Sequence, residues 1–146
     1  MKKALFFASI LLLPLCTFAL DAPANFTASL DEENGILNTD WEDVEGAVKY
    51  SVDVVVEYDT DGDGEADLSV DLSFGTSDRD DGGAMGDSYL EIPFDVAGFI
   101  DLDANEDGVP DALIDALARV KALGPGKGNG RQNNAFSAFA IFYPAP

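Results

Sequence analysis

The fold is decided by residues 48 to 58, which read Val48-Lys49-Tyr50-Ser51-Val52-Asp53-Val54-Val55-Val56-Glu57-Tyr58. Every second side chain is aliphatic or aromatic, and the residues between them are mostly polar. A period of two is the pattern of a strand that buries one face. Residues 68 to 74 alternate in the same way, and an aspartate- and glycine-rich stretch separates the two segments. The sequence therefore predicts a β-hairpin with this stretch at its tip.

Shorter segments with the same alternation lie on both sides of the hairpin. Leu37, Thr39 and Trp41 fall on one face of a short strand. Residues 89–94 and 135–143 are predicted to be further strands, and residues 75–88 a connection rich in glycine and aspartate. The predicted fold class is all-β, an antiparallel sandwich.

Residues 110–123 fit two structures. Pro110 and Asp111 at the start, and Arg119 and Lys121 near the end, are typical of a helix. Alternation over residues 118–123 is typical of a strand instead. We expect a short helical turn near residues 110–117 followed by a strand. A full helix over residues 110–123 stays open as the alternative, and it would favour a dockerin-like or EF-like calcium module.

Three early segments together resemble the opening of a fibronectin type III domain. They read Pro23-Ala24-Asn25-Phe26-Thr27-Ala28, Leu37-Asn38-Thr39-Asp40-Trp41 and Val44-Glu45-Gly46-Ala47-Val48-Lys49-Tyr50-Ser51-Val52. In that family a strand-B tryptophan, here Trp41, is followed about nine residues later by a strand-C tyrosine, here Tyr50. Residues 119–123 and Phe136-Ser137 resemble its strands F and G. The resemblance covers residues 22–143 and implies a seven-stranded immunoglobulin-like sandwich. It departs from the family at Ala116, where strand F normally carries a tyrosine.

Two nine-residue loops share one pattern of oxygen-bearing side chains. The first reads Asp59-Thr60-Asp61-Gly62-Asp63-Gly64-Glu65-Ala66-Asp67, and the second Asp103-Ala104-Asn105-Glu106-Asp107-Gly108-Val109-Pro110-Asp111. Both carry aspartate or asparagine at positions 1, 3, 5 and 9 and glycine at position 6. Ca²⁺ takes six to eight oxygen ligands, and alternate residues converge on one ion only where the backbone turns sharply. The expected metal ligands are these side chains together with position 7, where Glu65 and Val109 would offer a carbonyl.

The loops differ from an EF-hand at position 12. A bidentate glutamate would complete the calcium shell there, but this chain has Val70 and Ile114. The loops are more similar to the aspartate repeats of thrombospondin type 3. Such a shell predicts an affinity suited to a calcium-rich exterior and a structural role rather than a sensing one. In the sandwich topology both loops, and the acidic turn at residues 31–34, would lie at one pole.

The first 19 residues have the order of a signal peptide. Lys2 and Lys3 precede an apolar run over residues 4–15, and small residues stand at Thr17 and Ala19. Cleavage after Ala19 would leave one domain, residues 22–143, that is secreted or periplasmic and not inserted in a membrane. The formal charge of −20 would become −22 with the loss of the two lysines. Such an acidic surface makes nucleic acid a poor partner.

Catalytic chemistry has little support in the sequence. The chain has no histidine, and its one cysteine, Cys16, lies in the leader, so catalysis by histidine dyads or triads and histidine-bound zinc are excluded. We expect Trp41, Tyr50 and Tyr58 to pack in the core rather than to bind sugars. The expected function is a non-enzymatic binding or adhesion module, with an extracellular carbohydrate-binding accessory as the alternative. Its recognition loop for a glycan or an extracellular protein would lie in the glycine-rich segment that holds Lys127, Arg131, Gln132 and Asn133.

Overall fold

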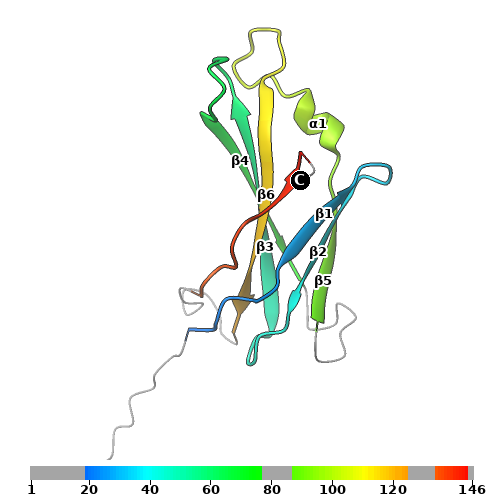
Figure 1. Cartoon of the computed structure of the whole chain (residues 1–146), viewed down its shortest axis with the longest axis vertical. Coiled ribbons are helices and arrows are strands. Elements are labelled where there is room, and N and C mark those ends of the chain that lie inside the picture. Colours follow the sequence, from blue (N-terminus) through cyan, green and yellow to red (C-terminus); the bar gives the residue numbers. More distant parts are fainter. Residues whose placement is uncertain (1–18, 77–86, 125–133, 145–146) are drawn as a thin grey trace, which may run out of the picture.

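The computed structural model describes residues 19–76, 87–124 and 134–144. Its strands form two antiparallel sheets with the core between them (Figure 1). One sheet has the order β1-β2-β5, from β1 (Thr27–Asp31), β2 (Ile36–Glu42) and β5 (Asp87–Pro93). The other has the order β4-β3-β6-β7, from β3 (Lys49–Asp59), β4 (Leu68–Gly75), β6 (Ala112–Leu123) and β7 (Ala140–Tyr143). One short helix, α1 (Val96–Ile100), follows β5. The all-β prediction is confirmed at this level.

The alternate side chains of β3 lie at the centre of the core. Its five inward side chains, from Tyr50 to Tyr58, are each at most 4% exposed, whereas Val48 lies just before the strand and is 40% exposed. The facing residues of β6 are small: Ala116, Ala118 and Ala122 stand opposite Val56, Val54 and Tyr50. These small side chains leave room for larger ones from the other sheet. Trp41 of β2 is fully buried, and its ring meets that of Tyr50 edge-on at 5.2 Å between centroids. The prediction that Trp41, Tyr50 and Tyr58 are core residues is confirmed.

The β3–β4 hairpin is confirmed as well. Pairs run from Ser51 with Gly75 to Tyr58 with Leu68, so the first aspartate loop lies at the tip. On its other side β3 pairs with β6 over its whole length, and the register shifts between Glu57 and Tyr58. These long strands carry both aspartate loops at one end of the molecule (Figure 1).

The helical turn predicted near residues 110–117 is wrong. Strand β6 begins at Ala112 and continues to Leu123, which also excludes the full helix over residues 110–123. The physical reason is β3, which extends to Asp59 and offers its backbone groups along that whole length, so pairing with β6 satisfies them. The helix that does form is α1, and the side chain of Asp95 caps it by accepting a hydrogen bond from the N–H of Ala97. At the place where the family's tyrosine is missing, Ala116 is buried against Val56.

The C-terminal strand is shorter than predicted. Residues 135–143 were expected to pair throughout, but β7 covers Ala140–Tyr143, and before it only Phe136 forms an isolated bridge, with Lys121. Among the described residues, no helix has the length and apolar character needed to span a bilayer. The predicted signal peptide, residues 1–19, lies outside the described residues apart from Ala19.

Candidate metal centre

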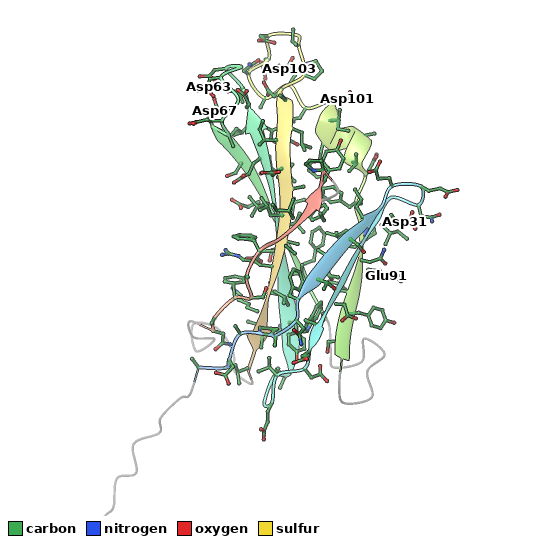
Figure 2. The ribbon with its side chains drawn as sticks, in the orientation of Figure 1. Asp31, Asp63, Asp67, Glu91, Asp101 and Asp103 are labelled. Atoms are coloured by element: carbon green, nitrogen blue, oxygen red, sulfur yellow. The ribbon has the colours of Figure 1, made fainter. Side chains whose placement is uncertain are left out.

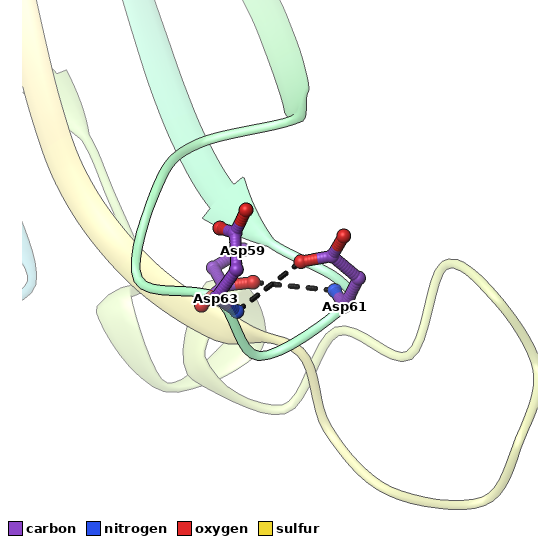
Figure 3. Close-up of side chains that lie close together, drawn as sticks. All are labelled: Asp59, Asp61 and Asp63. Carbon is purple, nitrogen blue, oxygen red and sulfur yellow. Dashed lines mark hydrogen bonds between the residues drawn. The ribbon is translucent and has the colours of Figure 1, made fainter.

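The first loop brings three of its predicted ligands together. One carboxylate oxygen from each of Asp59, Asp61 and Asp63 lies within 4.8 Å of the others (Figure 3). Calcium–oxygen distances are about 2.3 to 2.6 Å, so two ligands on opposite sides of one ion stand about 5 Å apart. The spacing of the three carboxylates is therefore within the reach of a single ion. Asp59 ends strand β3 and is 6% exposed, whereas Asp61 and Asp63 are exposed.

Backbone N–H groups hold these carboxylates in place. The carboxylate of Asp59 accepts from the N–H groups of Asp61, Gly62 and Gly64, at 3.2, 2.6 and 2.7 Å. The carboxylate of Asp61 accepts from the N–H of Asp63 at 3.2 Å, and that of Asp63 from the N–H of Glu65 at 2.8 Å. The loop therefore folds around its first aspartate, with side chains at positions 3 and 5 each turned toward the next segment of backbone.

The second loop repeats this arrangement. Asp103 accepts from the N–H groups of Asp107 and Gly108, at 3.1 and 2.8 Å. Asn105 accepts from the N–H of Asp107 at 3.0 Å, and Asp107 from that of Val109 at 2.8 Å. The hydrogen bonds from positions 5 and 7 to the side chains two residues earlier are thus common to both loops. So is the bond from the position 6 glycine to the first aspartate.

The backbone angles repeat too. Position 4 has a positive φ in both loops, +82° at Gly62 and +59° at Glu106. Position 6 has a positive φ of +89° at Gly64 and +88° at Gly108. Positive φ is the conformation that glycine adopts readily and other residues resist. The spacing that the two loops share in the sequence therefore corresponds to one loop conformation, which occurs twice in the chain.

The ninth residue closes each loop. The N–H of Asp67 donates to the carbonyl of Tyr58 at 2.9 Å, and the N–H of Asp111 donates to the carbonyl of Leu102 at 2.7 Å. The carboxylates of both aspartates turn back to position 2. Asp67 accepts from the N–H of Thr60 at 3.0 Å, and Asp111 from that of Ala104 at 2.7 Å. Position 9 therefore serves loop closure in both loops, while positions 1, 3 and 5 of the first loop converge.

Hydrogen bonds favour the charged form of the first aspartate in the first loop. The hydrogen bond from Gly64, followed by those from Gly62 and its neighbours, lowers the pKa of Asp59 below its usual value of 3.8, against the opposing effect of burial. The Asp59 carboxylate is therefore ionised at neutral pH beside two further aspartates. Within the described segments, the recorded ion pair joins Arg119 to Asp53 on the β4-β3-β6-β7 sheet and involves neither loop.

The two loops touch each other. The side-chain amide of Asn105 donates to the carbonyl of Thr60 at 3.3 Å and to the carboxylate of Asp111 at 3.2 Å. In Figure 2 Asp63, Asp67 and Asp103 lie at the same end of the molecule, and Asp31 lies well apart from them. The two loops thus share a pole as expected. The acidic turn that begins at Asp31 is a separate feature, since Asp31 bonds to the side chain of Asn34 within its own turn.

Positions 7 and 12 play different parts. At position 7 the side chains of Glu65 and Val109 are exposed, and their N–H groups are used within the loops. At position 12 Val70 packs against the core and Ile114 lies in β6, so neither offers an oxygen. The expectation that the loops lack the twelfth ligand of an EF-hand agrees with this placement. The predicted recognition residues Lys127, Arg131, Gln132 and Asn133 lie outside the described residues.

Sequence reasoning missed the residues that support the loops. Thr60 adds a hydroxyl to the clamp on Asp67, at 2.8 Å, and its carbonyl is the contact point for the second loop. Threonine at position 2 does not recur in the second loop, where Ala104 stands, so no repeat signalled it. The carboxylate partner of the buried Tyr50 was also missed: Asp43, which is itself exposed, accepts from Tyr50 and from Ser88 at the opposite end of the core.

The chain was compared with known proteins. No family model matches it, and neither a curated protein nor a solved structure matches it.

Proposed function

We propose that this protein is an exported, non-catalytic β-sandwich module that binds Ca²⁺ through the loops 59–67 and 103–111 and acts in binding or adhesion at the cell exterior. The observation that carries the proposal is the set of features that the two loops share: three hydrogen bonds, two positive φ positions and one closing bond. Ordinary acidic turns have no reason to repeat so many details. Binding of a hard cation, which needs several oxygens directed at one point, would explain the repetition.

The sandwich is proposed to be of fibronectin type III kind. If the strands are named A, B, C, C′, E, F and G in chain order, the two sheets are A-B-E and C′-C-F-G. This order fits that family, and the contact between Trp41 and Tyr50 fits its tryptophan and tyrosine pair. In this arrangement the calcium loops are the C–C′ and E–F connections.

The role proposed for calcium is structural. Without a cation, the carboxylates of Asp59, Asp61 and Asp63 repel one another at one end of a chain whose formal charge is −20. A cation removes that repulsion and joins residues from the end of β3 and its loop. Because the second loop contacts the first through Asn105, loading either loop also steadies the other. The partner-binding surface is proposed to lie elsewhere, in the segment with Lys127 and Arg131.

Thermal melting of the mature chain in calcium and in chelator tests the proposal. A site with a Kd of about 10⁻⁴ M gains about 2.7 kcal/mol of stability at 100 times that calcium concentration. We expect the midpoint to rise with calcium, and calorimetry to give two ions per chain. Mg²⁺ should act more weakly, because it demands a smaller and more regular shell. Equal midpoints in calcium and chelator would contradict the proposal.

Matched variants assign the effect to the loops. Asp63→Asn and Asp107→Asn each remove one charge at position 5, and each should abolish one binding event. Asp40→Asn removes the same charge from an exposed position on β2, so it controls for net charge. The proposal fails if Asp40→Asn weakens calcium binding as much as the loop variants do.

A further inference from the structure

The beginning of the described chain is tied to its end. The backbone nitrogen of Leu20 donates to the side-chain oxygen of Asn134 at 2.9 Å, across 114 positions of sequence. The amide nitrogen of the same Asn134 donates to the carbonyl of Ala122, in β6, at 2.6 Å. Asn134 therefore links the nitrogen of Leu20 to a central strand of the larger sheet.

The side chain of Leu20 is docked as well. It packs against the hydrophobic core and lies over two glycines. A Cβ atom added at Gly46 would stand 3.4 Å from one methyl group of Leu20, and one added at Gly124 would stand 3.6 Å from the other. Gly46 precedes β3 and Gly124 follows β6, so Leu20 bridges two connections. Ala19, immediately before it, is exposed.

We propose that Leu20 is the amino terminus of the mature protein and that its α-ammonium group, held by Asn134, is a structural part of the fold. Hydrolysis of the bond between Ala19 and Leu20 adds one water, which leaves a carboxylate on Ala19 and an amine on Leu20. At neutral pH this amine takes up a proton. The proposal rests on export, which is part of the proposed function, and is independent of calcium.

Cleavage improves the contact that is already present. Before cleavage the nitrogen of Leu20 has a single N–H, whereas the ammonium has three donors and a positive charge. Hydrogen bonds from a charged donor are roughly twice as strong as those between neutral groups. The new cation also lies in a strongly acidic protein, where the surrounding field favours it. Removal of the leader therefore strengthens a contact that the fold already makes.

The first test measures the docking directly. Two chains, residues 20–146 and residues 21–146, are released from a fusion that leaves no extra residue, each with Asn134 or with Asn134→Ala. Loss of Leu20 should lower the melting midpoint by about 4 °C or more, because the packing of a partly buried leucine side chain and a hydrogen bond are lost. Asn134→Ala should lower the midpoint more in the chain that begins at Leu20 than in the chain that begins at Asp21. Asn38→Ala, on the exposed face of β2, should lower both equally. Equal midpoints for the two chains would overturn the docking. So would an effect of Asn134→Ala on the midpoint that is the same whether or not Leu20 is present.

The second test isolates the ammonium group and keeps the side chain. A chain that begins at Ala19 retains Leu20 but turns its ammonium back into an amide. We expect it to melt below the chain that begins at Leu20, and equal midpoints would overturn the role of the charge. Mass spectrometry of the protein exported by a bacterial host that expresses residues 1–146 should give a chain that starts at Leu20. Another start would overturn the assigned cleavage site, whereas retention of the whole leader inside the cell would count against export itself.

Discussion

Glu106 has a positive φ, and the residue at the same position of the other loop is a glycine. Its φ is +59°, while Gly62 at the same position has +82°. A left-handed conformation costs a residue with a Cβ about 1 to 2 kcal/mol, and glycine avoids that cost. The larger entropy that glycine loses on folding offsets about 0.5 to 1 kcal/mol of the gain.

Glu106→Gly is therefore expected to raise the free energy of unfolding by about 0.5 to 1 kcal/mol, from the difference between these two effects. Urea denaturation in the presence of calcium measures it. Glu33→Gly, in the β1–β2 turn and without a positive φ, serves as the matched control and should be destabilising. A loss of stability in Glu106→Gly would contradict the assignment of strain to this residue.

Asp31 lies outside the two aspartate loops, and hydrogen bonds within its own turn hold its carboxylate. Hydrogen bonds from the side chain and then the backbone of Asn34 lower its pKa below 3.8. A carboxylate whose pKa is lower in the folded state contributes stability that is complete above the unfolded pKa and is lost as pH falls through the folded one. Asn34→Ala should move the pKa of Asp31 up toward 3.8. Carboxyl titration by NMR measures the shift, with Asn38→Ala as the variant that should leave it in place.

The repeat of aspartates predicted that Asp59, Asp61 and Asp63 approach one another, because alternate residues can converge where the backbone turns sharply at a glycine. Pattern could not reveal the contact between Asn105 and Thr60. That contact depends on how far two separate strands extend, which no local spacing records.

At the scale of elements, β6 carries a cluster of cations and rings on its outer face. The guanidinium of Arg119 lies 3.8 Å from the ring centroid of Phe136 and 4.6 Å from that of Phe139. The ammonium of Lys121 lies 4.5 Å from the centroid of Phe136. Ser137, between the two phenylalanines, exchanges hydrogen bonds with the backbone of Val120. This cluster attaches the segment before β7 to the sheet, where regular pairing is sparse.

The contacts of Arg119 with the two rings are expected to contribute more to the free energy of unfolding than its ion pair. Arg119 also faces Asp53 at 3.9 Å, but partly exposed ion pairs contribute about 0 to 1 kcal/mol. Two cation–π contacts contribute about 0.5 to 1 kcal/mol each, and more where water is excluded. Arg119→Met should therefore cost about 1 to 2 kcal/mol, and Asp53→Asn less.

Urea unfolding of both variants tests this order, with Lys49→Met as the control for the loss of a cation. Phe136→Leu should reduce the cost of Arg119→Met, because the two groups act as a pair. If Asp53→Asn lowered the free energy of unfolding more than Arg119→Met does, the ion pair and not the rings would be the main contribution of Arg119.

Residues 110–117 were predicted to form a helical turn, but β6 begins at Ala112. Local signals in Pro110, Asp111 and Arg119 favour a helix, and strand pairing with β3 overrides them. Helix α1 was missed because the sequence carries no clear local signal for it. It has five residues, too few to display a period, and depends on contacts such as the 3.0 Å bond from the hydroxyl of Tyr58 to the carbonyl of Phe99.

At the scale of the whole molecule, charge is unevenly distributed. The cations within the described ranges are Lys49, Arg119 and Lys121, and all three lie on the outer side of the β4-β3-β6-β7 sheet, away from the row that faces the core. The other charged side chains within the described ranges are aspartates and glutamates. The folded chain therefore repels itself over most of its surface.

Inert salt should accordingly stabilise the metal-free protein. The Debye length falls from about 30 Å at 0.01 M to about 10 Å at 0.1 M, so long-range repulsion between carboxylates is screened. We expect the melting midpoint in chelator to rise as sodium chloride increases over this range. Scanning fluorimetry measures it, and tetramethylammonium chloride shows whether any monovalent cation suffices. A midpoint that falls with salt would show that net attraction dominates.

The fold class could be predicted because alternation in residues 37–41, 48–58 and 68–74 reports which side chains face the core. The order of strands could not be worked out from alternation alone, since the pattern says that a strand has a buried face and not which strand lies beside it. The pairing of β2 with β5, for example, joins residues about fifty positions apart.

The closure of the two loops has a consequence for how such proteins are assembled. In each, the residue before the loop and the ninth residue are joined by one backbone hydrogen bond, from Asp67 to Tyr58 and from Asp111 to Leu102. Entry and exit are thus fixed by the nine residues themselves, although one loop joins two paired strands and the other joins a helix region to a strand. We therefore expect the nine-residue unit to keep its closing bond when it is moved to another connection whose two ends lie equally close.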